Sequence, residues 1–569
     1  MKFDFEALII GSGFGGAISA LRLSKKWPGR VMLVERGKRY GFGGFPRSPS
    51  DMSNNFFNLP GEKHRRPEQI SPDKNLGLFD IRSYEHMDVV MAAGYGGGSL
   101  VYANVFLEPP SEVFDERWPE GCKRDDLLPY YKICKSVMGS RKIPAGGEWE
   151  LEKVGYYQNT ALKLNRESEL VDINVFFGND PEKPLGQGLQ EVNRYGALQS
   201  SCNYCAECDI GCNIRAKNTL DLNYLHAAEH RYGLNVLTEQ KATRITPIGK
   251  EGFPSPGASG EYGYVVEVTD LNNDTKKSFR CRRVVVSAGT LGTNELLLRC
   301  RDEYQTLPKI SANLGRNFSG NGDFLAFIAE SDKKVEPTRG PVITQRIDFN
   351  LFKNFDPKRA FIMEDASYPN LVAWFVEGEK PTVMKISALW QGLVALVRRI
   401  LKRGTPGRMG GVLQKLFSGS ISRNSSVHLC MGYDESDGNI SLDQDRNLRL
   451  HWPFENSMRL YEAIMKSVAD FSDKVKARFH FALPTWNWPL RRNVTVHALG
   501  GCRLAGTAED GVTDSAPERF GQVFSYENLY VADGSLLPSA VGANPALTIS
   551  ALAERVAEGI TGDKPDDQL

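Results

Sequence analysis

The N-terminal 37 residues alternate between apolar runs and polar breaks in a pattern that predicts one βαβ unit. Ala7–Ile10 and Val31–Val34 are apolar runs without alternation, as expected for strands buried on both faces of a parallel sheet. Between them, small and apolar residues recur at helical spacing over 17–23. Strand, helix and strand therefore follow one another at the start of the chain.

A glycine motif joins the first predicted strand to the helix. Gly11, Gly13 and Gly16 have the G-x-G-x-x-G spacing, and Glu35 ends the second strand about 20 residues later. The first glycine permits a tight turn, the second lets the backbone approach a pyrophosphate, and the third lets helix and strand pack closely. The helix N-terminus favours phosphate, and an acid at the second strand's end suits ribose hydroxyls. We interpret this unit as a dinucleotide site.

Further segments of this type recur far along the chain. Val284–Cys300 predicts a buried strand, a glycine turn and a helix, and 528–533 predicts another strand, followed by a helix after Pro545. Val236–Ile245 and Tyr262–Thr269 predict strands. We therefore expect an α/β fold with a Rossmann-like domain assembled from discontinuous segments.

Composition narrows the function classes. A net charge of +1 over 569 residues argues against a general polyanion binder, and we expect no nucleic-acid partner. The start KFDFEALII leads directly into a strand, without the pattern of a secretory signal, and no apolar run reaches the roughly 20 residues of a membrane span. These features predict a cytoplasmic protein whose ten cysteines are reduced thiols or metal ligands.

One stretch is basic and free of acids. Between Pro381 and Tyr433 there is no Asp or Glu, and ISALWQGLVALVRRILKR places apolar residues on one helical face. Either the helix packs on the core with a basic outer face, or residues 385–417 make a peripheral contact with the inner face of a membrane.

Four cysteines form the densest chemical motif: Cys202, Cys205, Cys208 and Cys212. Their spacing equals that of bacterial ferredoxin iron–sulfur loops, although Asn213 stands where those loops have proline. Three interpretations stay open: an iron–sulfur cluster such as [4Fe–4S], a tetrahedral zinc ion, or a loop of thiols without metal.

The C-terminal motifs carry a resemblance to a known family. VHALGGCRL (496–504), NLYVADGS (528–535) and ANPALTISALAER (543–555) resemble the signature of the glucose–methanol–choline oxidoreductases. The bacterial cholesterol oxidase-like subgroup is the most similar, because mycobacterial-type members also carry a cysteine run before an AKNTL-like stretch, here Ala216–Leu220. The resemblance covers most of the chain and is loose over 320–480.

The resemblance implies FAD as the cofactor. Members with covalently attached flavin carry a His near the glycine loop, where this chain has Val101 and Tyr102, so we expect non-covalent FAD. The predicted cofactor-binding residues are Gly11, Gly13, Phe14, Gly15, Gly16, Glu35, Arg36, Gly96, Gly97, Gly98, Ser99, Tyr102, Ala103, Asn104, Ala242, Ala288, Gly289, Asp533, Gly534, Asn544 and Pro545.

The resemblance also implies two catalytic residues, His497 and Asn544. A neutral imidazole can take the hydroxyl proton of an alcohol, and the Asn544 amide can hold the same oxygen. Cholesterol oxidases also use a Glu for steroid double-bond isomerisation. Our alignment places Arg423 and no acid near that position, so we predict no isomerase activity.

We therefore predict a two-domain enzyme. Residues 1–45, 85–110, 195–320 and 485–569 form the FAD domain, and 111–194 and 321–484 form a substrate domain with a mixed or antiparallel sheet covered by helices. We predict that this enzyme oxidises a sterol- or lipid-like alcohol to a ketone or aldehyde and passes the electrons to oxygen or to an electron carrier. One alternative is a non-steroid alcohol dehydrogenase that passes electrons through an iron–sulfur loop. The other is a flavin-binding protein with redox-neutral chemistry or no alcohol turnover.

Overall fold

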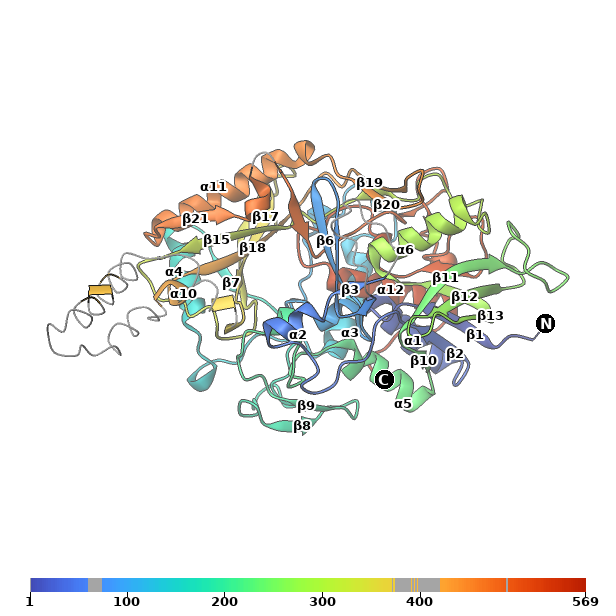
Figure 1. Ribbon diagram of the computed structural model, residues 1–569, viewed down its shortest axis with the longest axis horizontal. Helices are drawn as coiled ribbons and strands as arrows, with labels where there is room; N and C mark the ends of the chain where they lie inside the picture. Colours follow the sequence, from blue (N-terminus) through green and yellow to red (C-terminus); the bar gives the residue numbers. More distant parts are fainter. Residues whose placement is uncertain are drawn as a thin grey trace.

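The computed structural model describes residues 2–59, 74–370, 420–487 and 490–568, with a few single positions between 372 and 397. Two large sheets lie side by side along the long axis of the molecule (Figure 1). The basic segment 385–417 falls almost wholly outside the described residues, so its predicted membrane contact stays a prediction. None of the helices in the described part is long and apolar enough to cross a membrane.

The first sheet contains the predicted βαβ unit at its centre. Its strands run in the order β10 (Asn235–Leu237), β2 (Val31–Val34), β1 (Phe5–Ile10), β13 (Lys276–Val286), β12 (Tyr264–Asp270) and β11 (Gln240–Pro247). β25 (Leu529–Val531) also pairs with β13, in parallel. One strand thus separates β1 from β25, so the N-terminal and C-terminal parts of the chain meet in one sheet.

Helices from distant parts of the chain pack on one another beside this sheet. They are α1 (Phe14–Lys26), α3 (Arg124–Met138), α5 (Tyr224–Tyr232) and α12 (Ala546–Thr561), whereas α6 (Gly289–Leu298) follows β13 directly. Arg22 on α1 forms a buried ion pair with Glu554 on α12 at 2.7 Å. The N-terminal unit and the last helix are therefore tied together inside the protein.

Close backbone contacts require glycine at two positions of the glycine motif. A Cβ atom on Gly16 would lie 2.0 Å from the carbonyl oxygen of Gly11, and one on Gly15 would lie 1.3 Å from that of Ala532. Both distances are far below van der Waals contact, so only glycine lets α1 pack on β1 and on the C-terminal strand.

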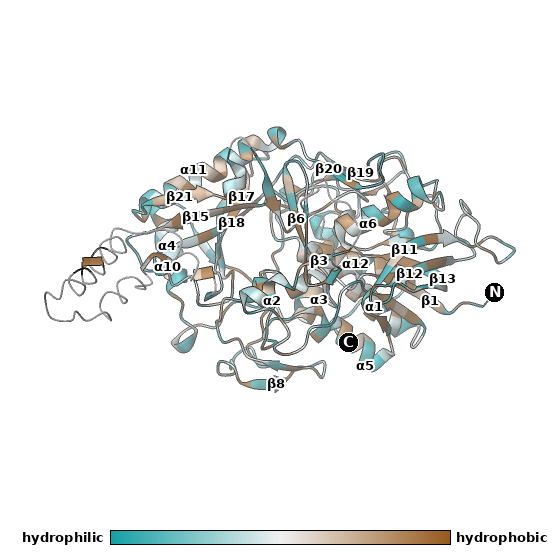
Figure 2. Ribbon diagram, in the orientation of Figure 1, coloured by the Kyte–Doolittle hydropathy of each residue, from teal (hydrophilic) through white to brown (hydrophobic). Residues whose placement is uncertain are grey.

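The second sheet is antiparallel throughout. Its order is β21 (Phe479–Ala482), β15 (Phe324–Ala329), β18 (Ser426–Gly432), β17 (Phe361–Ala366), β16 (Gln345–Phe349) and β7 (Ser168–Leu170). The helices α11 (Met458–Lys474) and α4 (Glu152–Lys163) cover one of its faces (Figure 1). α11 carries both hydrophilic and hydrophobic residues (Figure 2), as expected for a helix with one buried side.

Smaller elements connect these two layers. A three-stranded sheet of β22 (Asn493–Thr495), β6 (Met87–Ala92) and β5 (Phe79–Ser83) lies between them (Figure 1). The remaining strands and short helices are β14 (Arg316–Phe318), β19 (Gly438–Leu442), β20 (Leu448–His451), β23 (Leu504–Ala505), β24 (Thr513–Asp514), β3 (Phe57–Asn58), β4 (Asn75–Leu76), β8 (Gln190–Val192), β9 (Leu198–Ser200), α2 (Pro49–Ser53) and α10 (Ser420–Arg423).

Candidate active site

One cavity of about 1000 Å³ runs from the end of the βαβ unit to the face of the second sheet. Most of the predicted cofactor and catalytic residues line it, although they come from widely separated parts of the chain. These residues are Gly11, Gly13, Phe14, Gly15, Glu35, Arg36, Gly97, Gly98, Tyr102, Ala103, Ala242, Ala288, Gly289, Asp533, Gly534, Asn544, Pro545 and His497.

Four predicted cofactor residues do not line the cavity and lie behind its wall: Gly16, Gly96, Ser99 and Asn104. Gly96 adopts a left-handed backbone with φ of 117°, and its N–H donates to Ser12 Oγ at 3.0 Å. Ser99 is fully buried, and its hydroxyl accepts the N–H of Leu220 at 3.1 Å. Gly96, Ser99 and Asn104 belong to the loop whose residues Gly97, Gly98, Tyr102 and Ala103 line the cavity, whereas Gly16 lies in α1.

The cradle around the glycine motif fits an extended cofactor such as FAD. A Cβ atom on Gly13, Gly98 or Gly289 would meet no protein atom within 4 Å, and all three residues line the cavity. Side chains at these positions would therefore fill space that the cavity keeps open. α1 also begins at this point, after Gly13, with no side-chain cap on its first N–H groups. Uncapped N–H groups at a helix start favour a phosphate.

Two buried acids, Glu35 and Asp533, line the same cavity. Glu35 accepts hydrogen bonds from the Ser12 N–H at 3.0 Å and the Gly37 N–H at 2.8 Å, and burial raises its pKa. Asp533 accepts the Ser535 N–H at 2.9 Å and the hydroxyl of Thr293, and burial raises its pKa as well. Backbone donors thus fix both carboxyl groups in place beside the cavity.

His497 is held by a carboxylate from the turn that leads into β15 of the second sheet. It follows β22, and its Nδ1 lies 2.8 Å from Oδ1 of Asp323, a residue that is only 2% exposed. A carboxylate oxygen accepts but does not donate, so the neutral ring carries its proton on Nδ1. Nε2 makes no hydrogen bond to any described residue, and His497 lines the cavity. The unprotonated ring nitrogen is therefore free to act as a base.

Asn544 lies beside an acid that the sequence analysis missed. Its Nδ2 is 3.3 Å from Oε2 of Glu364 on β17, and Glu364 is fully buried. Burial is the main reason that the pKa of Glu364 rises to about 8. The sequence alignment places Arg423 and no acid near the position of the isomerising Glu. In the structure Arg423 is exposed and does not line the cavity, and the acid beside Asn544 comes from β17. The available signal was an acid inside the apolar strand FIMEDA.

The cavity beyond His497 and Asn544 is apolar. Alternate residues of β15 point in opposite directions: Phe324 packs against Tyr461 of α11, and Leu325 and Phe327 line the cavity. Further apolar residues complete this region: Val342, Ile343, Ala366, Val427, Leu429, Phe481, Val494 and Val496. A few hydroxyl groups are interspersed, from Ser367, Tyr368, Ser425 and Ser426.

The four-cysteine motif lies in a separate small cavity. Cys202, Cys205, Cys208 and Cys212 all line it together with Lys217, whose pKa falls to about 8 mainly because of burial. All four thiols are free. In the described part of the chain, however, no group of three or more His, Cys, Asp or Glu residues is arranged to hold a metal ion. The predicted iron–sulfur cluster therefore has no support from the structure.

Known proteins resemble the chain over nearly its full length. It is 29% identical to a cholesterol oxidase of Acinetobacter baumannii, covering 97% of this chain and 94% of that protein. It is 44% identical to a paromamine 6'-oxidase of Streptomyces fradiae, covering 98% and 92%. The solved structure of pyridoxine 4-oxidase from Mesorbium loti has the same fold, with a TM-score of 0.59, 15% identity and coverage of 97% and 98%.

The family models agree with these comparisons. Residues 5–318 match the N-terminal model of the GMC oxidoreductases, and residues 434–553 match the C-terminal model. Both match regions contribute to the cavity, the first with the glycine motif and the second with His497 and Asn544. The chain therefore belongs to the GMC oxidoreductase family and is an FAD-dependent oxidoreductase of alcohols.

Proposed function

We propose that the protein oxidises a hydrophobic, sterol- or lipid-like alcohol to a ketone or aldehyde. The observation that carries this proposal is the apolar region of the cavity: Leu325, Phe327, Leu429 and Phe481 on β15, β18 and β21 line the same cavity as His497 and Asn544. An apolar wall binds the body of such a substrate through burial of its surface, about 25 cal/mol per Å². The polar groups at its inner end orient the hydroxyl group.

Each catalytic residue has a distinct task in this proposal. FAD, when bound, accepts the hydride that leaves the alcohol carbon. His497 takes the hydroxyl proton at Nε2, because its Nδ1 proton is already held by Asp323. With a pKa of about 8, Glu364 is protonated at neutral pH, and its Oε2 accepts one N–H of the Asn544 amide at 3.3 Å. The second N–H of the same amino group then holds the substrate oxygen.

Residues from both ends of the chain would hold FAD without a covalent bond. Gly11, Gly13 and Glu35 are assigned to its adenosine diphosphate half, and Asp533 and Pro545 to the flavin half. The observation behind this assignment is that all five line one cavity. α12 starts after Pro545 with no side-chain cap, so its N-terminus favours negative charge at the nearby end of the flavin.

One relative favours a second substrate class. The paromamine 6'-oxidase shares a higher percentage of identical residues with this chain than the cholesterol oxidase does, and its name specifies paromamine, an amino sugar. Ser367, Ser425 and Ser426 in the cavity wall would hydrogen-bond such a polar alcohol. The apolar residues in the same region outnumber them, and for this reason we rank the hydrophobic alcohol first.

A substrate panel tests the proposal. The FAD-loaded protein is mixed without oxygen with a sterol, a long-chain primary alcohol and an amino-sugar alcohol, and bleaching of the flavin absorbance is timed. We expect the first two to reduce the flavin, and we expect His497→Ala to slow this step by roughly 10²–10⁴-fold. The matched control is His451→Ala, an exposed histidine on β20. Reduction by the amino sugar alone would refute the hydrophobic-alcohol proposal.

The electron acceptor is decided in the same experiment. We propose molecular oxygen, because cholesterol and long-chain-alcohol oxidases are among the relatives and their names describe oxidases. Admitting air to the reduced protein should restore the flavin absorbance within the time of one catalytic turnover. Reoxidation much slower than turnover would point to a dehydrogenase that uses an electron carrier.

A further inference from the structure

A five-residue turn, Ser319–Asp323, touches both catalytic segments. It connects β14 (Arg316–Phe318) to β15 (Phe324–Ala329), and its polar residues are fully or almost fully buried. The catalytic segments themselves come from a much later part of the chain, around His497 and Asn544. The turn is therefore a point at which the fold can control the two catalytic side chains together.

Asp323 fixes the segment that carries His497. Its Oδ2 accepts the Thr495 hydroxyl and the Val496 N–H, each at 2.9 Å, and its Oδ1 faces His497 Nδ1 at 2.8 Å. On the other side of His497, Ser319 and Leu499 exchange two backbone hydrogen bonds, of 2.9 and 3.1 Å. Hydrogen bonds to the turn thus hold the chain both before and after the imidazole.

Asn321 fixes the segment that leads to Asn544. Its Oδ1 accepts the N–H groups of Val541 and Gly542 at 3.0 Å, and its Nδ2 donates to the Ala543 carbonyl at 2.8 Å. Asn321 is fully buried and adopts a left-handed backbone with φ of 55°. Asparagine tolerates this conformation better than most residues do. The Asn321 side chain therefore makes the hydrogen bonds that a neighbouring strand would otherwise make with the backbone of the three residues before Asn544.

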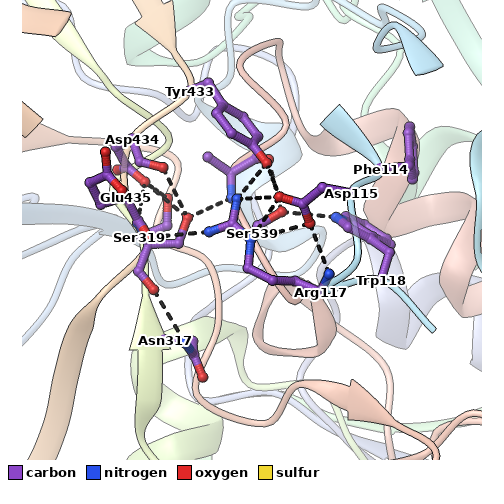
Figure 3. A network of polar contacts seen from close by, with 12 residues as sticks. Phe114, Asp115, Arg117, Trp118, Asn317, Ser319, Tyr433, Asp434, Glu435 and Ser539 are labelled. Atoms are coloured by element: carbon purple, nitrogen blue, oxygen red, sulfur yellow. Dashed lines mark hydrogen bonds and ion pairs between the residues drawn. The ribbon is translucent and has the colours of Figure 1, made fainter. Parts of the chain in front are cut away.

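Asp434 anchors the turn through hydrogen bonds. It accepts hydrogen bonds from the Ser319 hydroxyl at 2.7 Å and from the N–H groups of Gly320 at 3.0 Å and Gly322 at 3.2 Å. Figure 3 shows Asp434 and Ser319 in one polar network with Tyr433 and the Asp115–Arg117 ion pair. The turn is thus anchored on a buried carboxylate and does not depend on solvent for its hydrogen bonds.

We propose that Ser319–Asp323 is a positioning element for the catalytic pair, in which Asp323 sets the tautomer of His497 and Asn321 sets the position of Asn544. This inference rests on the proposed function, because it assigns roles toward the alcohol hydroxyl. Asp323 and Asn321 are positioning residues: the contacts that define their roles are with His497 and with the residues preceding Asn544. The two roles are separable, since each uses a different side chain of the turn.

Asp323→Asn tests the first role without depending on a substrate. The Val496 N–H needs an acceptor, so the carbonyl oxygen of the new amide stays at the Oδ2 position and its NH₂ group faces Nδ1. The His497 proton must then move to Nε2. In ¹⁵N NMR of the FAD-loaded protein, with the His497 signals assigned by His497→Gln, we expect the Nδ1–H tautomer in the wild type and the Nε2–H tautomer in Asp323→Asn.

Kinetics and a control complete this test. Loss of the unprotonated Nε2 should slow flavin reduction by about 10²–10⁴-fold, with a smaller change in the alcohol concentration needed for half-saturation. Asp348→Asn is the control, because Asp348 also accepts N–H groups of a turn, those of Leu351 and Phe352, in the same sheet. It should keep the wild-type tautomer and rate. An unchanged tautomer in Asp323→Asn would overturn the proposal for Asp323.

Asn321→Gly tests the second role. Glycine accepts the positive φ but lacks the amide that holds residues 541–543. We expect flavin reduction to slow by about tenfold or more, while the His497 tautomer stays as in the wild type. A wild-type rate in Asn321→Gly would overturn the role of Asn321. If no alcohol reduces the wild-type flavin, the proposed function fails, whereas the tautomer change in Asp323→Asn still reports on the positioning role.

Discussion

Replacing Glu364 by glutamine should change how the stability of the protein depends on pH. Glu364 is fully buried on β17, and its pKa rises from the ordinary 4.5 to about 8, chiefly because burial disfavours the charged form. The neighbouring Asp365 and Asp323 add to this rise. Between these two pKa values, the folded protein keeps a proton on Glu364 that the unfolded chain releases.

The sign and size of the effect follow from this difference in bound protons. An acid with a raised folded-state pKa costs nothing below about pH 4.5, and its cost grows as the pH rises towards about 8. Each pH unit in this window removes about 1.4 kcal/mol of unfolding free energy, and the whole window removes on the order of 5 kcal/mol. Glutamine stays neutral at every pH and retains an oxygen that can accept the Asn544 amide, so Glu364→Gln should lack this slope.

Urea unfolding of the FAD-loaded protein, followed by tryptophan fluorescence, measures the effect. We expect the wild type to lose stability relative to Glu364→Gln as the pH rises from about 5 to 8. Glu169→Gln is the control, since Glu169 lies on β7 of the same sheet with its side chain 52% exposed. Its curve should run parallel to that of the wild type. If Glu364→Gln also ran parallel to the wild type, the account of a protonated Glu364 would be refuted.

Two further predictions concern the FAD cradle and the contact between the chain ends. Gly13→Ala should fold but retain less FAD, because its Cβ would project into open space in the cavity. Gly15→Ala should fail to fold, because its Cβ would lie 1.3 Å from the Ala532 carbonyl oxygen. Gly41→Ala is the control: a Cβ at this position would have no neighbour within 4 Å, so the variant should change neither flavin content nor yield. Glu554→Gln should lower the unfolding free energy by up to about 3–5 kcal/mol, since it leaves the buried Arg22 with only the longer ion pair to Asp566 at 3.8 Å. Asp563→Asn, in an exposed ion pair with Lys26, should cost under about 1 kcal/mol. Equal effects of Glu554→Gln and Asp563→Asn in urea unfolding would contradict this reasoning.

The sequence by itself determined the parts of this protein whose physical causes are local. A buried strand, a turn that only glycine allows and the start of a helix lie within a few residues, so 7–16 shows them directly. The family could also be identified from the sequence alone, because its motifs at 496–504 and 543–555 are short, contiguous stretches of the chain. The expected α/β fold is confirmed, and the second sheet, which was expected to be mixed or antiparallel, is antiparallel.

Only the tertiary structure decided what surrounds the proposed catalytic pair, His497 and Asn544. Glu364 lies in a strand and Asp323 in an irregular turn, and neither has a periodic pattern that marks it as part of a site. The pairing of β17 with β18, and the polar contacts of the 319–323 turn, bring them to Asn544 and His497. Sequence patterns report which residues prefer burial or a given local backbone. The pKa of Glu364 and the free Nε2 of His497 arise instead from burial and partners supplied by residues more than a hundred positions away.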